Sequence, residues 1–79
     1  MSELELLREV VRAYLAERRA YDEWSAPMSE RLRRGDRSQP SDEMIQQQLK
    51  GLDALNARKA DLTRALDRLR EVAPDLFND

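Results

Sequence analysis

The stretch Leu52–Leu69, LDALNARKADLTRALDRL, decides the fold. Leu55, Leu62 and Leu69 lie seven residues apart in it, and Leu76 continues this spacing beyond it. Ile45, Leu52 and Leu66 fill the alternate positions. Apolar residues that repeat every 3.5 positions line one side of an α-helix and keep that side against a partner helix. The stretch therefore predicts a long helix that packs lengthwise on another helix.

A second apolar ladder with the same spacing runs through the first half of the chain. Its members are Leu4, Leu7, Val11, Tyr14, Tyr21, Met28 and Leu32. Two helices that are joined by a short loop pack side by side and antiparallel. We therefore predict an all-α fold, an antiparallel helical hairpin that resembles a coiled coil, in which the two ladders face each other.

Capping residues and prolines set the expected boundaries within a single domain. Ser2 is a good N-cap, and Gly35 can adopt the left-handed conformation that ends many helices. Pro27 removes a helical donor, so we expect the first helix to be kinked or broken there. The expected segments of the domain over 1–79 are helix 1a over about 2–24, helix 1b over about 27–34, a loop over 35–39, helix 2 over about 40–72 and a C-terminal turn over 74–79.

The composition narrows the range of functions. The chain has no histidine and no cysteine, which removes disulfides and the usual ligands of structural zinc. A net charge of −2 argues against general binding to nucleic acids or anionic membranes, and no apolar run is long enough to span a bilayer. We expect a cytoplasmic protein that binds no cofactor, no metal ion, no membrane and no nucleic acid.

The first helix carries a second, weaker apolar stripe. A chain of 79 residues without disulfides buries a small core, and such chains often gain stability from self-association. Three roles are open for the stripe: it widens the hairpin seam, forms a homodimer that makes a four-helix bundle, or docks a foreign protein. The candidate dimer or docking residues are Leu6, Val10, Ala13 and Ala20.

Aromatic and arginine side chains near the predicted loop are candidate contacts for a partner protein, because these residue types are enriched at binding hot spots. Burial in the core is the alternative for the apolar candidates, and solvation of the helix end is the alternative for the arginines. The candidates are Tyr21, Trp24, Met28, Arg31, Arg33, Arg34 and Arg37.

These features favour a non-catalytic module that binds and modulates another, unidentified protein or assembly, and we expect a homodimer. In size, acidity and lack of catalytic groups the chain resembles small phage-encoded inhibitors of host defence, anti-CRISPR proteins among them, which gives a narrower alternative. A second alternative is a small helical-bundle enzyme that binds an anionic metabolite through Arg18, Gln48 and Lys59 on the ladders. Without histidine or cysteine, few groups could transfer protons, and we expect no catalysis.

Overall fold

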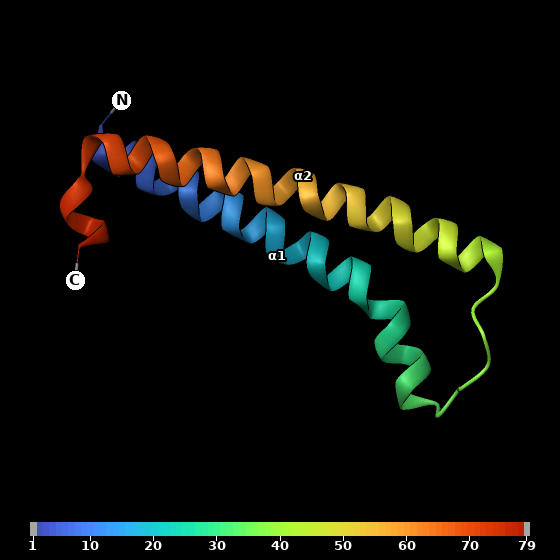
Figure 1. Ribbon diagram of the computed structural model, residues 1–79. Coiled ribbons are helices and arrows are strands. Elements are labelled where there is room, and N and C mark those ends of the chain that lie inside the picture. The colour runs from blue at the N-terminus through green and yellow to red at the C-terminus, as the bar shows by residue number, and fades with distance from the viewer. Residues whose placement is uncertain (1, 79) are drawn as a thin grey trace.

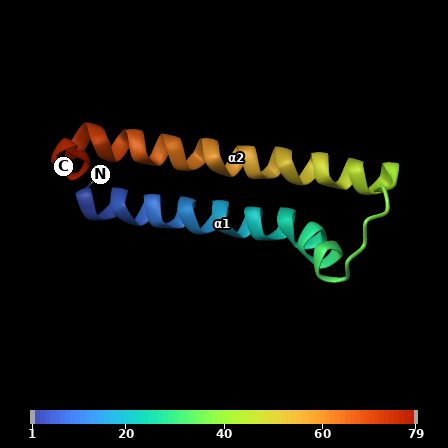
Figure 2. The ribbon, with the colours of Figure 1, turned by 60° about the horizontal axis from the view of Figure 1, so that its bottom comes forward.

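The computed structural model describes residues 2–78 and consists of two long helices packed against each other (Figure 1). Helix α1 spans Glu3–Arg33 and helix α2 spans Asp42–Val72, each with 31 residues, and a short 3₁₀ helix, η1, spans Pro74–Phe77. Figures 1 and 2 show α1 and α2 running in opposite directions, with both chain ends at one end of the hairpin and the loop at the other. The predicted all-α helical hairpin is confirmed.

Serine side chains cap the start of both long helices. The hydroxyls of Ser2 and Ser41 each accept a hydrogen bond from the backbone N–H three residues further on, at 3.2 Å in both cases. Helix α2 therefore begins two residues later than the expected start at residue 40, because Pro40 precedes the cap. A serine hydroxyl satisfies one of the free donors of the first helical turn, which a proline side chain cannot do.

Pro27 lies inside α1 rather than at a break. The structure has one continuous helix over Glu3–Arg33, so the expected division into segments 2–24 and 27–34 is not present. Proline removes its own N–H bond to the carbonyl four residues earlier, and the neighbouring turns keep theirs. Figures 1 and 2 show that the last turns of α1, drawn in green, diverge from α2 toward the loop.

The C-terminal segment turns away from α2 after Ala73. Leu76 belongs to η1 and is largely exposed, so the leucine ladder of α2 does not continue to it. Phe77 is half-buried, and the guanidinium carbon of Arg70 lies 4.9 Å from the centroid of its ring. The expected turn over 74–79 can be followed to Asn78, and Asp79 lies outside the described residues.

The two helices meet through a different side of α1 from the one that was predicted. Within residues 2–78, the buried apolar side chains are Leu6, Leu55, Ala65 and Leu69. On α1 the seam continues through half-buried residues, namely Val10, Ala13, Ala20 and Trp24. The stripe that was a candidate dimer surface is therefore the intramolecular seam of the hairpin.

The predicted ladder of α1 faces solvent instead. Leu4 is 57% exposed, Val11 55%, Tyr14 52% and Leu32 79%. On α2 the prediction was better, because Leu55 and Leu69 are buried and Leu62 and Leu66 are half-buried, although Ile45 and Leu52 are exposed. Only one of the two predicted ladders thus contributes to the hairpin seam.

The register of the seam follows from one close contact. A Cβ atom placed on Gly51 would lie 3.0 Å from Cδ1 of Trp24, so these residues are directly opposite each other. In an antiparallel pair each step forward on one helix matches a step back on the other. This register places Leu6 level with Leu69, and both are 3% exposed.

Side-chain size explains which stripe of α1 forms the seam. Both stripes have helical spacing, so spacing alone does not distinguish them. The stripe that packs on α2 has Ala13 and Ala20 near its centre, whereas the exposed stripe has Tyr14 and Tyr21 at nearly the same levels. Alanine allows two helix axes to approach closely, and tyrosine would hold them apart. The resulting hairpin is thin and long, with extents of 50 × 22 × 18 Å.

Candidate functional site

Most of the large apolar side chains that are exposed on the hairpin belong to one surface, which we call the apolar face. Each of its residues follows a seam residue directly in the sequence, or continues that spacing. On α1 they are Leu4, Leu7, Val11, Tyr14, Tyr21 and Leu32, with the half-buried Met28 among them, and on α2 they are Ile45, Leu49 and Leu52, with the half-buried Leu66.

Helix geometry puts the contributions of α1 and α2 on the same side of the hairpin. A residue that follows a seam residue lies about 100° further round its helix. Because the helices are antiparallel, this rotation carries both sets of side chains to the same broad side of the pair. Met28 of α1 and Ile45, Leu49 and Leu52 of α2 line one cavity, together with the seam residues Trp24 and Met44.

This cavity, which we call the loop-end groove, lies where the two helices separate. It has a volume of about 300 Å³. Its lining is mostly apolar, with Trp24 and Met28 on one side and Met44 and Leu52 on the other. The ring of Tyr21 lies 6.0 Å from that of Trp24, centroid to centroid. The groove brings together the three apolar contact candidates from the sequence: two line it, and Tyr21 stands beside it.

The opposite side of the hairpin carries charges rather than large apolar groups. Glu9 of α1 and Arg68 of α2 form an ion pair across the two helices at 3.1 Å. Asp61 pairs with Arg64 along α2 on the same side. Charged pairs of this kind are solvated and contribute little to stability. The two broad sides of the hairpin therefore differ in composition, because most of the large exposed apolar side chains lie on the apolar face, with Arg18, Lys59 and Arg70 among them.

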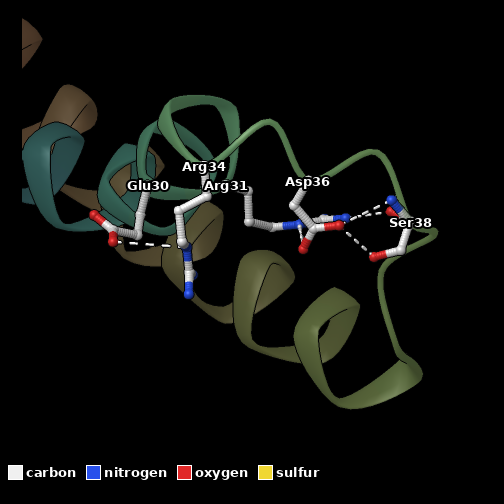
Figure 3. Close-up of polar contacts among 5 residues, drawn as sticks. All are labelled: Glu30, Arg31, Arg34, Asp36 and Ser38. Atoms are coloured by element: carbon white, nitrogen blue, oxygen red, sulfur yellow. Dashed lines mark hydrogen bonds and ion pairs between the residues drawn. The ribbon is translucent and has the colours of Figure 1, made fainter.

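The loop between the helices is held by a cluster of polar contacts (Figure 3). Gly35 has a φ of +68° and closes α1 in a Schellman motif, in which its N–H donates to the carbonyl of Leu32 and the next N–H donates to the carbonyl of Arg31. The Asp36 carboxylate accepts bonds from the backbone N–H of Ser38 at 2.9 Å and from its hydroxyl at 2.6 Å. These contacts give the loop a defined shape.

Arg31 belongs to this cluster. Its guanidinium donates to the carbonyl of Ser38 and lies 3.6 Å from the Asp36 carboxylate, and only 19% of its side chain is exposed. The hydrogen bonds from Ser38 hold the pKa of Asp36 below its usual value, and the nearby charge of Arg31 acts in the same direction. Arg31 therefore holds the loop and the wall of the groove, so it presents little of its charge to a partner.

The other arginines of the tip are more exposed. Arg34 pairs with Glu30 at 3.7 Å along α1 (Figure 3). Within the described residues, Arg33 and Arg37 form no ion pair, and both are exposed. Of the four arginine candidates, these two leave the most charge available to an incoming surface.

The three residues of the predicted anion site do not converge. Gln48 lines the loop-end groove, whereas Arg18 and Lys59 are exposed near the middle of the hairpin. Gln48 and Lys59 are eleven residues apart in α2, which is about 16 Å along the helix axis. Arg18 is directed toward Asp22, at 3.7 Å, and over the ring of Tyr21, at 5.5 Å. The structure therefore does not bring these three residues together in one pocket.

Sequence reasoning missed the part of the face that α2 supplies. Leu49 was assigned no role, and Ile45 and Leu52 were assigned to the seam, yet all three line the loop-end groove. A signal was present: Ile45, Leu49 and Leu52 are spaced like a second stripe, beside Met44, Gln48 and Gly51 of the seam. Met44 and Gly51 were not recognised as seam residues, because the predicted ladder of this helix was drawn through its leucines and isoleucine.

Comparisons with protein-family models, with curated proteins and with solved structures found no match. Neither long helix contains a stretch apolar enough to cross a lipid bilayer. Across residues 2–78, no three acidic side chains gather in a way that could hold a metal ion. The candidate functional site therefore consists of the apolar face, with the loop-end groove and the two exposed arginines at its tip.

Proposed function

We propose that this protein is a non-catalytic interaction module whose apolar face binds another polypeptide. The observation that carries the proposal is the one-sided exposure of large apolar side chains on a hairpin whose other broad side is charged. Soluble monomers rarely leave a large contiguous apolar patch in water, and such patches mark interaction surfaces. The narrower hypothesis of a phage-encoded inhibitor is one form of this function and rests on the sequence alone.

The loop-end groove supplies the anchoring part of the surface. Trp24 and Met28 line it, Tyr21 stands beside it, and aromatic residues contribute disproportionately to binding energy. Pro27 lies between the two lining residues, and we propose that it bends α1 and so sets the width of the groove. Arg33 and Arg37 add positive charge beyond the loop end, which favours a partner with carboxylates at that place.

Affinity capture tests the function with a matched pair of variants. Leu49→Glu puts a charge into the apolar face, while Leu15→Glu puts the same charge outside it, and the two leucines are 53% and 56% exposed. Each tagged protein is mixed with lysate of the source cell and with an untagged copy of this chain, so that a second copy can also be captured. The retained polypeptides are identified by mass spectrometry. We expect the wild type and Leu15→Glu to retain the same polypeptide, and Leu49→Glu to lose it. Equal retention by all three proteins, or by none, would contradict the proposal.

A further inference from the structure

The exposed area of the hairpin is larger than that of a compact monomer of this mass. Its accessible surface is 6448 Å², whereas a compact folded monomer of 9.2 kDa exposes about 4,900 Å². Its radius of gyration is 17.1 Å, against roughly 12 Å for a compact domain of 79 residues. The excess of about 1,500 Å² is more than the roughly 800 Å² that each partner buries in a stable interface of standard size.

The geometry of the two stripes indicates how many helices are missing. Each helix has one apolar stripe in the seam and another about 100° away on the apolar face, and on α2 this second stripe consists of Ile45, Leu49, Leu52 and Leu66. In a four-helix bundle every helix contacts two neighbours at roughly right angles, so it needs two stripes in this relation. A single helix laid between α1 and α2 would need stripes closer together, about 60° apart. The hairpin thus presents half of a four-helix bundle, and the missing half is another pair of helices.

We propose that the apolar face is covered by a second copy of this chain, which completes a symmetric four-helix bundle. The proposal rests on the interaction function above and names its partner. A second hairpin brings two helices with the same stripes and the same excess area, so one self-complementary contact covers both copies. The dimer surface is therefore the stripe of Leu7, Val11, Leu49 and Leu52, and not the stripe of Leu6 and Val10.

Three cations lie on the apolar face, and their charges affect how tightly a second copy can bind there. Arg18 is paired with Asp22 at 3.7 Å, and Arg70 with Asp67 at 3.8 Å. Lys59 forms no ion pair within residues 2–78, and it lies near the middle of α2. Two copies that overlap fully bring their Lys59 side chains into the same layer, where like charges repel. The dimer is consequently expected to tighten when this charge is removed or screened.

Sedimentation equilibrium over a range of protein concentrations tests the proposal. We expect a mass of twice 9.2 kDa for the wild type and for Leu15→Glu, and dissociation at least tenfold easier for Leu49→Glu. Lys59→Met should tighten the dimer several-fold, and added salt should also tighten the wild-type dimer, because it screens the repulsion between the two Lys59 side chains. A wild type that stays monomeric at all concentrations overturns the proposal, and so does a dimer that Leu49→Glu and Leu15→Glu weaken equally.

The outcomes separate this proposal from the function on which it rests. A monomeric wild type that captures a foreign acidic protein through Leu49 removes the dimer and leaves the interaction function standing. A monomer that captures nothing defeats both. If Leu49→Glu unfolds, the melting temperature of the wild type decides: it rises with protein concentration when folding is coupled to dimerisation and stays constant when it is not.

Discussion

The contact between Trp24 and Gly51 supports a quantitative prediction about the hairpin seam. Glycine in a helix interior costs about 1 kcal/mol relative to alanine, so Gly51→Ala should stabilise α2 by about that amount if the methyl group has space. The added methyl group has little space when Trp24 is present, because the new Cβ would lie 3.0 Å from Cδ1 of that side chain. Overpacking of this kind costs on the order of 1–3 kcal/mol.

The indole has some freedom to move, which sets the size of the effect. Trp24 lines the loop-end groove on one side and a second cavity of about 230 Å³ on the other. The overpacking cost should therefore fall near the lower end, about 1 kcal/mol, and offset the gain in helix propensity. We expect Gly51→Ala to leave the free energy of unfolding nearly unchanged in the wild type.

A double-mutant cycle isolates the contact. Trp24→Ala should cost about 2 kcal/mol, because the side chain is only half-buried. In that background the methyl group of Gly51→Ala meets open space, so the same substitution should stabilise by about 1 kcal/mol. The predicted coupling between the two sites is therefore about 1 kcal/mol. It is measured by urea unfolding followed by circular dichroism at 222 nm, at one fixed protein concentration. A Gly51→Ala effect that is the same in both backgrounds would refute the antiparallel register.

Three further predictions concern the loop and the helix caps. The hydrogen bonds from Ser38 and the charge of Arg31 lower the pKa of Asp36 in the folded protein. The ionised carboxylate therefore stabilises the fold at pH values above its pKa in the unfolded chain, and this stabilisation is lost as the pH falls through its pKa in the folded protein. The melting temperature of Asp36→Asn should accordingly depend less on pH in the acidic range than that of the wild type. Ser41→Ala should lower the free energy of unfolding by about 1 kcal/mol through loss of the N-cap, and urea unfolding measures this. Gly35→Ala should cost about 1–2 kcal/mol in the same assay, because φ is +68° there and no atom lies within 4 Å of the added methyl group, so the cost is conformational alone.

The local features of the hairpin could be predicted from the sequence because their causes are local. Ser2 caps α1 with the N–H of Glu5, and Gly35 ends the same helix in the left-handed conformation. Each depends on a few adjacent residues. The start of α2 was predicted at Pro40, which is typical of the first helical turn, and Ser41 was not recognised as the N-cap. The hydroxyl of Ser41 decides between them, since only it can accept the bond that the first turn offers.

The choice of seam could not be predicted in the same way. Periodicity identifies stripes on a helix, and α1 has two of them with equal spacing. The stripe with larger residues looks like the better core, yet it would need a partner that provides room for Tyr14 and Tyr21. Gly51 and the alanines at the centre of the hairpin favour close approach instead, and this information lies in the pairing of two helices. The loop cluster had a partial signal, because Asp two residues before Ser is typical of an Asx turn, but nothing in the sequence connects it to Arg31.

The distribution of apolar residues is itself an argument that the hairpin does not act alone. A hairpin of two helices needs one apolar stripe per helix, and here the residue before each seam position is mostly charged, small or polar, as in Glu9, Arg64 and Arg68. The residue after a seam position is mostly large and apolar on α1, and on α2 it is apolar at Ile45, Leu49, Leu52 and Leu66, whereas polar residues follow Leu55, Leu62 and Leu69. If both broad sides of the hairpin only faced water, solvation would favour polar groups equally before and after the seam positions. The asymmetry follows directly if the second stripe has a surface of its own to cover, and it places that surface at right angles to the seam, where a four-helix bundle requires it.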